Sequence, residues 1–545
     1  MPTIAYDKKD LLKLVGKEFK DEELREIIES IKPSVEKITE KEVVLEHCAD
    51  RIDLFGIEGL ARAIRQYVGL KPGLTKYKVG KSGLTVLADS VPVRPYIGCA
   101  VVKGVRLEDS LIKSLMNIQE VLHETVGRKR RKVAIGVHDF DRIKPPIRYV
   151  GVPREEKIVP LGHSEEMSLK EVLEKTEKGK EYGAIIQSSR LWPAFVDTIS
   201  IFSFPPIINS ERTRVTEKTK NLFIDVTGTD RLAVIQVLSI LVTNLAERGC
   251  KLESVRIKYK KKVETTPDLN ERVIEVSKDL VNNLLGLSLE GKEMIRLLRK
   301  MGYEAIDYKD KLEVIVPSYR LDILHPVDIV EDVAIAYGYN NFELVNPRVE
   351  SIGKLDELEK FSDRIRSLMV GFGLQEVIRH VFTNQEDQFD KMEIRRSDVI
   401  EVANPVSQEY TCLRVWLLPS LIKVLSANKH VEYPQKLFEV GDVVLPAEGE
   451  TMSKSVRKLC VVISHSTAGF AEIKSVAEKF LASLGIRYSL RMLGHPSFID
   501  GRACQILIKG KEVGYFGEIH PKVLENWNLE MPVIAFEIEL ENLLS

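Results

Sequence analysis

Four acidic side chains lie close together in the sequence, on either side of a proline that suits a helix start. They are Asp322, Asp328, Glu331 and Asp332, and the proline is Pro326. A missing N–H costs nothing at the first position of a helix, and the last three acids would share one helical face. Converging carboxylates repel one another unless a cation neutralises them, and Mg²⁺ is the natural oxygen-liganded ion. The alternative is that these acids only oppose the helix macrodipole.

A second group of polar residues follows a proline-rich segment. The run Ser-Phe-Pro-Pro-Ile-Ile at 203–208 contains two prolines, which argue against a helix and a central strand, so we expect a stiff connector. Residues 223–227 alternate as a strand does, which places Asp225 and Thr227 on one face. A carboxylate and a hydroxyl facing a proline wall would make a small polar pocket. The alternative is a pair of turn-capping residues.

Five consecutive basic residues stand at 128–132, between a predicted helix at 109–125 and a predicted strand at 133–137. Such a run can bind a phosphate backbone. The alternative is a solvated charged surface, which is the common outcome for charge runs. Lys plus Arg is 80 and Asp plus Glu is 81, so a nucleic-acid binder of this composition needs a local basic patch.

Length and composition indicate a multidomain globular protein. The 545 residues are too many for one core. The six cysteines are scattered without a Cys-x-x-Cys pair, which argues against zinc and disulfide frameworks and fits a reducing cytosol. The N-terminus has no signal-peptide pattern, and no run of about 18 apolar residues occurs. We therefore expect a cytoplasmic protein without a membrane span.

The patterning predicts an α+β chain of four domains: 1–75, 76–262, 268–347 and 350–545. The first alternates helices and short strands, with helices at 8–15, 22–31 and 54–68. Residues 265–268 read as a linker after the second. The third has the order helix, hairpin, helix, which resembles a winged-helix module. The fourth combines helices at 356–372 and 420–429 with strands at 436–442, 503–508 and 512–518.

The acidic stretch resembles the signature of a known family. It reads Pro-Ser-Tyr-Arg-Leu-Asp-Ile at 317–323 and Glu-Asp-Val-Ala-Ile-Ala-Tyr-Gly-Tyr at 331–339, with Asp328 between them. This pattern resembles the phenylalanyl-tRNA synthetase β subunit, in whose family these four acids bind Mg²⁺ at the contact with the α subunit. The resemblance therefore implies a metal at Asp322, Asp328, Glu331 and Asp332.

The polar group in the second domain is similar to a segment of the same family. Pro-Pro-Ile-Ile-Asn-Ser at 205–210 and Phe-Ile-Asp-Val-Thr-Gly at 223–228 resemble editing-domain segments of archaeal β subunits. There, the residues matching Ser203, Asp225 and Thr227 line the pocket that receives a misacylated amino acid. Phe195 sits where that family has an apolar lining residue, although the loop between Phe195 and Ser203 differs in length. No Ser/His/Asp arrangement is evident, so we expect attack by a positioned water.

The last domain resembles the antiparallel-sheet core of class II aminoacyl-tRNA synthetases without its catalytic motifs. Active members have two arginines, in Phe-Arg-x-Glu and Gly-Leu-Arg segments, which neutralise the charge built up during adenylate formation. This chain has Leu-Phe-Glu-Val at 437–440 and Phe-Gly-Glu-Ile at 516–519. The resemblance implies a synthetase fold without the synthetic chemistry.

The resemblance also implies a function. A β subunit of the shorter, archaeal or eukaryotic form would work with an α subunit in an (αβ)₂ heterotetramer that joins phenylalanine to tRNA(Phe) using ATP and Mg²⁺. The α chain would form the adenylate, and this chain would contact tRNA and hydrolyse misacylated Tyr-tRNA(Phe). Two alternatives remain open. A free-standing trans-editing deacylase leaves residues 268–545 without a role, and a winged-helix nucleic-acid-binding regulator leaves the pocket at 203–228 unexplained.

Overall fold

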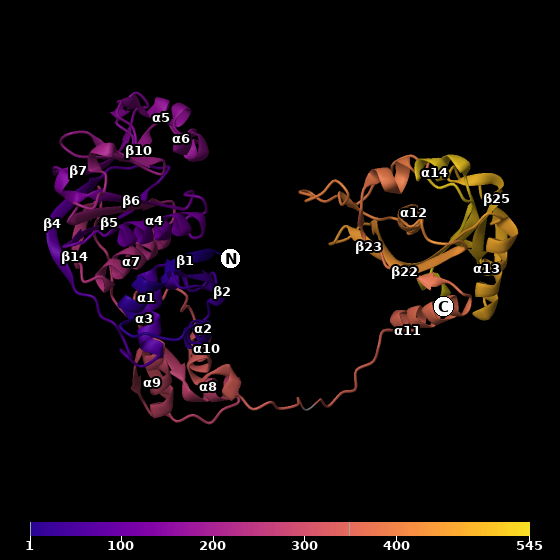
Figure 1. Cartoon of the computed structure of the whole chain (residues 1–545), viewed down its shortest axis with the longest axis horizontal. Coiled ribbons are helices and arrows are strands. Elements are labelled where there is room, and N and C mark those ends of the chain that lie inside the picture. The colour runs from indigo at the N-terminus through magenta and orange to yellow at the C-terminus, as the bar shows by residue number, and fades with distance from the viewer. Residues whose placement is uncertain (1, 348, 545) are drawn as a thin grey trace. The chain divides into compact units, whose positions relative to one another are not determined.

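The computed structural model describes residues 2–347 and 349–544 and divides into two compact units, Met1–Val345 and Asn346–Ser545 (Figure 1). Three of the four predicted domains fall in the first unit. The predicted first and last domains begin and end at residues 1 and 545, which lie outside the described residues.

The first unit begins with a small module around the antiparallel sheet β1-β3-β2. Its strands are β1 (Thr3–Asp7), β2 (Ser34–Ile38) and β3 (Glu42–Glu46), and its helices are α1 (Lys8–Val15), α2 (Asp21–Ser30) and α3 (Ile57–Tyr67). The predicted helix at 54–68 is shorter than expected. Leu54 ends a separate 3₁₀ turn, Ile52–Leu54, and α3 begins at Ile57 with Gly56 as its N-cap residue.

A ten-stranded mixed sheet forms the middle of the first unit, in the order β12-β11-β10-β7-β4-β14-β5-β13-β6, with β15 paired to β14. Its strands are β4 (Val79–Ala88), β5 (Tyr96–Lys103), β6 (Val133–Asp139), β7 (Ile147–Val152), β10 (Trp192–Val196), β11 (Ile201–Phe204), β12 (Ile208–Asn209), β13 (Asn221–Gly228), β14 (Lys251–Lys258) and β15 (Val263–Thr266). The short elements β8 (Lys157–Ile158), β9 (Met167–Ser168), α5 (Leu169–Lys175) and α6 (Glu177–Tyr182) form an excursion between β7 and β10.

Two predictions about this sheet are wrong. Residues 265 and 266 are not linker but end β15, because the Thr266 hydroxyl donates to Cys99 O at 2.7 Å and accepts from Cys99 N at 2.9 Å. Ser203 lies in β11 rather than in a connector, and the two prolines form only the turn to β12. Both prolines therefore stay outside the strands, as their missing N–H groups require.

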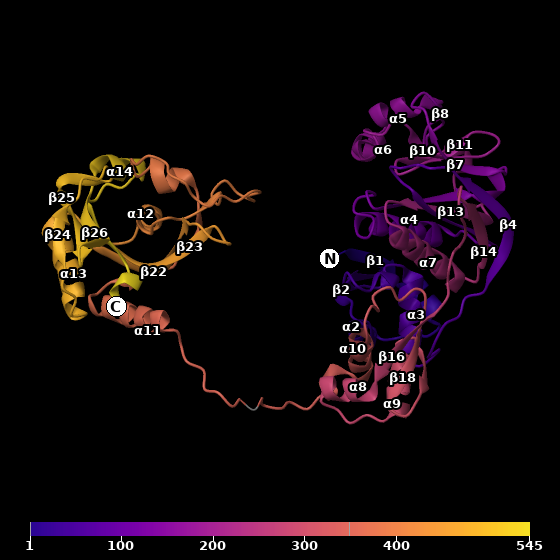
Figure 2. The same cartoon turned by 180° about the vertical axis from the view of Figure 1, so that it is seen from behind.

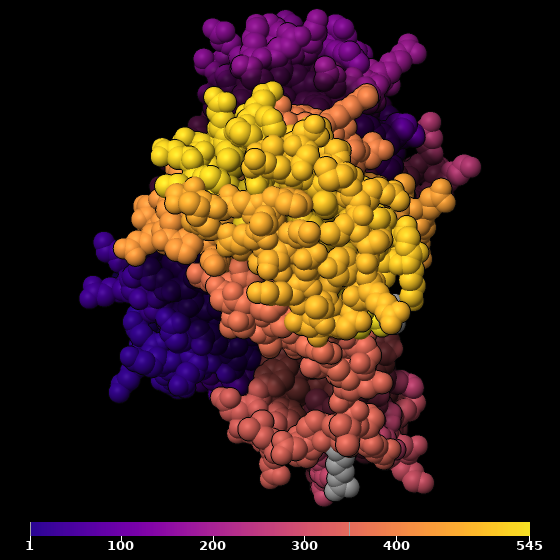
Figure 3. Space-filling model, turned by 90° about the vertical axis from the view of Figure 1, so that its right-hand side faces the viewer, coloured from indigo at the N-terminus to yellow at the C-terminus, as the bar shows by residue number. Residues whose placement is uncertain are grey.

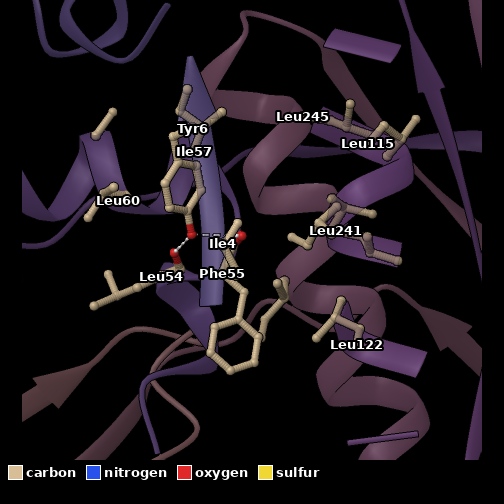
Figure 4. Close-up of a cluster of buried hydrophobic side chains, with 14 of the residues drawn as sticks. Ile4, Tyr6, Leu54, Phe55, Ile57, Leu60, Leu115, Leu122, Leu241 and Leu245 are labelled. Atoms are coloured by element: carbon tan, nitrogen blue, oxygen red, sulfur yellow. Dashed lines mark hydrogen bonds between the residues drawn. The ribbon is translucent and has the colours of Figure 1, made fainter. Parts of the chain in front are cut away.

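The small module and the large sheet share one core, shown in Figure 4. Helices α4 (Asp109–Glu124) and α7 (Arg231–Glu247) pack on one face of the sheet and meet the module on their other side. The buried side chains at this junction include Ile4, Leu54, Phe55, Leu60, Leu115, Leu122, Leu241 and Leu245. Each fully buried aliphatic side chain contributes about 1.5–3 kcal/mol. The module thereby fixes the two helices that support β13 and β6.

The last part of the first unit is a three-stranded antiparallel sheet, β16-β18-β17, with three helices. The hairpin and the final helix agree with the predicted order, whereas a strand and a helix at its start were not predicted. Its elements are β16 (Arg272–Ser277), α8 (Lys278–Leu285), α9 (Gly291–Lys300), β17 (Glu304–Asp307), β18 (Lys311–Val316) and α10 (Pro326–Tyr337).

The second unit, which Figure 2 shows from behind, is built on a seven-stranded sheet in the order β19-β22-β23-β27-β26-β25-β24. All neighbouring strands are antiparallel except β19 and β22. Its strands are β19 (Gln375–Glu376), β22 (Gln435–Pro446), β23 (Ser453–Ser464), β24 (Ser489–Met492), β25 (Phe498–Ile508), β26 (Lys511–Ile519) and β27 (Val533–Glu539). The other elements are α11 (Glu357–Gly371), β20 (Phe382–Thr383), β21 (Cys412–Leu413), α12 (Leu418–Ala427), α13 (Phe470–Ser483) and α14 (Pro521–Asn526).

Both faces of the seven-stranded sheet are covered. Helices α11 and α13 bury one face, and α12 with Trp416 and Trp527 buries the other. The C-terminal half of this unit, yellow in Figure 3, presents a continuous surface on the side shown. In the described part of the chain no helix is long and apolar enough to cross a membrane.

Candidate active site

A cavity of about 510 Å³ lies in the first unit where the two ends of the large sheet approach each other. At this seam Asn209 of β12 donates its side-chain N–H to the Val137 carbonyl of β6, at 3.4 Å. The walls come from α4, β6, the turn between β11 and β12, and a 3₁₀ turn at Glu211–Thr213. The lining is mostly apolar, and its polar members include His123, Arg130, Ser203, Asn209, Thr213 and Asp225. The size and lining are typical of a small-molecule site.

The Asp225 carboxylate is the buried acid of this cavity, with its side chain projecting from β13. Asp225 is 1% exposed and lies opposite Gly136 in the register of β13 and β6. A Cβ at position 136 would come within 2.3 Å of Asp225 Oδ2, so the glycine leaves the space that the carboxylate fills. His138 Nε2 lies 2.8 Å from Oδ2. Oδ1 has no hydrogen-bond partner among the described residues and is the oxygen left for a ligand.

His138 fixes this carboxylate and is itself fixed from the other side. Its Nδ1 lies 2.9 Å from Thr213 Oγ1, and its ring packs edge-on against Phe202 with centroids 5.1 Å apart. Nε2 of His138 thus faces Asp225 Oδ2, and Nδ1 faces the Thr213 hydroxyl, which also lies 3.4 Å from the Ser210 carbonyl oxygen. The chain Thr213–His138–Asp225 has the connectivity of a nucleophile–base–acid triad, which the sequence did not reveal.

The geometry nevertheless argues against a catalytic triad. His138 is fully buried and is not among the residues that line the cavity, so it has no access to a leaving group. A general base must lie within hydrogen-bonding reach of the proton that it moves. His138 therefore orients Asp225 and does not exchange protons with a ligand.

Ser203 lines the cavity without a base beside it. Its Oγ lies 3.4 Å from Asn209 Oδ1, and no described histidine contacts it. A serine hydroxyl is a weak nucleophile unless a base activates it. Ser203 and Asn209 are thus placed to hold a ligand or a water molecule rather than to form a covalent intermediate.

The other two predicted pocket residues lie behind the cavity wall. Thr227 Oγ1 accepts from Arg94 Nε at 3.1 Å, and its carbonyl accepts from Arg94 Nη2 at 2.6 Å. Phe195 packs in an aromatic core, with its ring centroid 4.8 Å from that of Tyr149 and 5.9 Å from that of Phe202. Neither is among the lining residues. The structure therefore brings Ser203 and Asp225 to the cavity, and Thr227 and Phe195 to the layer beneath it.

Two of the four acids predicted to bind a metal share one arginine. Arg320 Nη2 lies 2.6 Å from Asp322 Oδ2 and 2.6 Å from Asp332 Oδ2. The Tyr303 hydroxyl also donates to Asp332, whose Oδ1 is buried without a partner. Burial alone would raise the pKa of Asp322, but the Arg320 guanidinium lowers it to about 2. Arg320 thus supplies positive charge between two of the acids.

The other two acids have partners of their own. Asp328 accepts from the backbone N–H groups of Leu324 and His325, both at 2.7 Å, and so caps α10. Glu331 pairs with Lys32 of the N-terminal module at 3.0 Å. No group of three or more His, Cys, Asp or Glu side chains in the described ranges is arranged to hold a metal ion. The four acids as placed do not fit one shared cation site, and the Mg²⁺ site stays a prediction.

The two segments in which the resemblance led us to look for catalytic arginines, residues 437–440 and 516–519, lie in β22 and β26. Phe438 is buried in the core beneath α11 and α13. Arg414 reaches the sheet but is 1% exposed and pairs with Glu439 at 2.8 Å. Glu537 accepts from the backbone N–H groups of Leu417 and Leu418 and so caps α12 over the sheet. This arrangement keeps α12 packed on that face of the sheet.

Comparison with known proteins places these features in one class. Three family models match along the chain: the B3/4 domain at residues 105–265, the tRNA synthetase B5 domain at 274–339 and the phenylalanyl tRNA synthetase beta chain CLM domain at 344–540. The cavity lies in the first of these ranges, the acidic helix in the second and the covered sheet in the third. Fold and site thus define a tRNA synthetase chain of several domains.

Full-length relatives identify the family. The chain is 46% identical over 554 residues to the phenylalanine–tRNA ligase β subunit of Pyrococcus furiosus, covering all of both chains. It is 44% identical to that of Methanocaldococcus jannaschii, over 99% of this chain and 100% of the other. A crystal structure of an N-terminal fragment of the Pyrococcus horikoshii phenylalanyl-tRNA synthetase β subunit matches with a TM-score of 0.61 and 44% identity, covering 62% of this chain and 100% of the fragment. The chain belongs to the phenylalanine–tRNA ligase β-subunit family.

Proposed function

We propose that this chain acts with an α subunit in an (αβ)₂ heterotetramer that joins phenylalanine to tRNA(Phe) using ATP and Mg²⁺. The α chain forms the adenylate, and this chain provides scaffold, tRNA contacts and editing. The covered sheet of the second unit supports this division of labour. The six free thiols of the chain fit the reducing cytoplasm. No step on this chain is assigned to the Mg²⁺ ion.

Editing of Tyr-tRNA(Phe) is the function that the cavity supports best, and the free oxygen of Asp225 is the observation that carries it. A synthetic pocket for phenylalanine rejects an analogue with an added hydroxyl by only roughly 10²-fold. The cavity favours the amino acid that carries the hydroxyl, which is the opposite preference. Oδ1 of Asp225 accepts the phenolic O–H of tyrosine, whereas phenylalanine would leave this buried acceptor unpaired at a cost of about 1–3 kcal/mol.

The reaction is hydrolysis of the ester between the amino acid and the terminal ribose. A water molecule adds to the ester carbonyl carbon, and the tetrahedral intermediate collapses with the ribose oxygen leaving as a hydroxyl. The products are free tyrosine and tRNA(Phe). Ser203 and Asn209 orient the ester or the water through their hydroxyl and amide groups, which is catalysis by positioning.

Deacylation of pre-charged tRNA by the complex with the α subunit tests this function. We expect Asp225→Asn to lower the hydrolysis of Tyr-tRNA(Phe) at least tenfold, while charging with phenylalanine stays near normal. Asp139→Asn is the matched control, because Asp139 is also buried and hydrogen-bonded, to Thr219, but does not line the cavity. Undiminished hydrolysis in Asp225→Asn would place editing elsewhere. Equal hydrolysis without the α subunit would favour a free-standing deacylase.

A further inference from the structure

A turn of unusual backbone conformation borders the cavity. It comprises residues 127–132, Gly-Arg-Lys-Arg-Arg-Lys, and is called the basic turn below. Arg128, Lys129 and Arg130 have φ angles of 48°, 54° and 61°. Non-glycine residues adopt this left-handed region rarely, and three in succession are held only when the surroundings enforce it. Such conformations cluster at functional sites. Two arginine side chains hold this turn in place.

The first anchor is the side chain of Arg130, which is buried in the cavity wall. Its Nη1 donates to the carbonyls of Pro206 and Ile207 at 3.2 and 3.1 Å, and its Nη2 pairs with Glu120 at 3.0 Å. The guanidinium also lies over the Tyr182 ring, 4.5 Å from the centroid. The middle of the basic turn is therefore part of the cavity itself.

The second anchor is Arg94, which binds the backbone of the turn. Its Nη1 donates to the carbonyls of Arg130 and Arg131 at 3.0 and 3.4 Å. The same guanidinium binds Thr227 on β13, two residues beyond Asp225. Burial lowers the pKa of Arg94 to about 10, so the group stays charged at neutral pH. Arg94 thus ties the basic turn to the strand that carries the cavity's carboxylate.

Three basic side chains of the turn take no part in these anchoring contacts. Arg128, Lys129 and Arg131 are exposed and have no ion-pair partner among the described residues. Their neighbours in the turn are neutralised, Arg130 by Glu120 and Lys132 by Asp230 at 3.1 Å. The unpaired charges of Lys129 and Arg131 therefore stand on either side of Arg130, the residue of the basic turn that lines the cavity.

We propose that the basic turn binds the sugar-phosphate backbone of the RNA strand whose aminoacylated 3′ end enters the cavity. This inference rests on the proposed editing function. A rigid turn presents three donors to successive phosphates without first having to become ordered, and charge-assisted bonds from arginine to phosphate are strong. Thr227 acts here as a positioning residue, because it holds Arg94 and thereby the turn.

The test uses the full complex with the α subunit and the triple variant Arg128→Ala, Lys129→Ala, Arg131→Ala. We expect the KM for deacylation of Tyr-tRNA(Phe) to rise at least tenfold and kcat to stay unchanged. Hydrolysis of 3′-O-tyrosyl-adenosine, which lacks the phosphates, should not change. Each lost phosphate contact of a single strand lowers the slope of log affinity against log salt by about 0.7, so three contacts lower it by about 2.

A matched control removes the same charge from the opposite end of the same sheet. Lys78, Lys81 and Lys251 are exposed, have no ion-pair partner in the described ranges, and lie where β4 and β14 begin. Their triple alanine variant should leave the KM and the salt slope unchanged. An unchanged KM in the basic-turn variant, or equal losses on both substrates, would overturn the proposal.

A direct binding measurement separates this inference from the editing proposal. The affinity of the complex for uncharged tRNA(Phe) is titrated against salt, with wild type and both triple variants. A reduced slope in the basic-turn variant supports the phosphate contact even if the cavity proves not to hydrolyse Tyr-tRNA(Phe). An unchanged slope in the basic-turn variant contradicts it.

Discussion

At the scale of single residues, the cavity depends on the absence of a side chain at position 136. The Cβ of an alanine there would lie 2.3 Å from Asp225 Oδ2 and 2.9 Å from His138 Nε2. Both groups are buried, so the carboxylate has to leave its position. We expect Gly136→Ala to lower Tyr-tRNA(Phe) hydrolysis at least tenfold and the free energy of unfolding by about 1–3 kcal/mol.

Hydrolysis assays and chemical unfolding of the same preparation check this expectation. Gly80→Ala is the control, because Gly80 lies in β4 with its nearest side-chain atom at 3.6 Å. If Gly136→Ala edits as well as Gly80→Ala, the carboxylate position is not what selects tyrosine.

Thr213 is the second single-residue test, since its hydroxyl holds His138. Thr213→Val keeps the shape of the side chain but leaves Nδ1 of His138 without its partner, and an unpaired buried polar atom costs about 1–3 kcal/mol. We expect weaker discrimination between Tyr-tRNA(Phe) and Phe-tRNA(Phe), measured as the ratio of their deacylation rates. Thr213→Ser restores the hydroxyl and should restore the ratio.

The control for this variant is Thr219→Val. Thr219 is equally buried and donates to Asp139 at 2.9 Å, but it does not line the cavity. A nucleophilic role for Thr213 predicts a different result, namely a trapped tyrosyl ester on Thr213 and no activity at all in Thr213→Val.

At the scale of elements, the sequence predicted strands and helices better than it predicted partners. The alternation at 223–227 places Asp225 and Thr227 on one face of β13, as expected. It could not show that Thr227 binds Arg94, because that contact joins distant parts of the chain. The prediction of a linker was wrong at residues 265 and 266 for the same reason. Thr266 is buried by Cys99, which lies far away in the sequence.

The acidic helix α10 illustrates this limit further and permits a test. The spacing of its acids is compatible with a shared ion, but their partners Arg320 and Lys32 cannot be found from spacing. Asp328 is the third residue of α10 and completes a capping box with His325, the N-cap residue, so Asp328→Ala should lower the free energy of unfolding by about 0.5–2 kcal/mol. If the four acids bind Mg²⁺ as predicted, the metal content of the chain should also fall in this variant, because the ion loses one of its four carboxylates.

Thermal unfolding and elemental analysis of the purified chain measure the two quantities separately. Asp307 is exposed and pairs with Lys278 but caps no helix, so Asp307→Ala serves as the control. A lower free energy of unfolding with unchanged metal content would contradict the four-acid site and leave Asp328 with the capping role alone.

At the scale of the whole molecule, the chain divides into two compact units, and the four domain boundaries within them stay a prediction. Residues 1–75 read as a separate domain because their apolar pattern is complete in itself. In the structure Ile4, Leu54 and Phe55 share a core with Leu241 and Leu245 of the large sheet's helix. Sequence periodicity identifies which face of a helix is buried but not which other element buries it. The resemblance to a family, in contrast, rests on sequence matches along the whole chain and does not depend on which elements pack together.

The last prediction concerns the synthetic reaction and belongs to the second unit. Adenylate formation needs cations at the reacting phosphates. In this unit Arg414 is buried in an ion pair with Glu439. Helix α12 covers the same face of the sheet. We expect this chain alone to catalyse no phenylalanine-dependent exchange of pyrophosphate into ATP, and addition of the α subunit to establish the exchange. Arg414→Met should leave the exchange by the complex near normal if its role is structural, provided that the complex still assembles. Robust exchange by the isolated chain would mean that α12 leaves this face of the sheet and that arginines other than Arg414 bind the reacting phosphates.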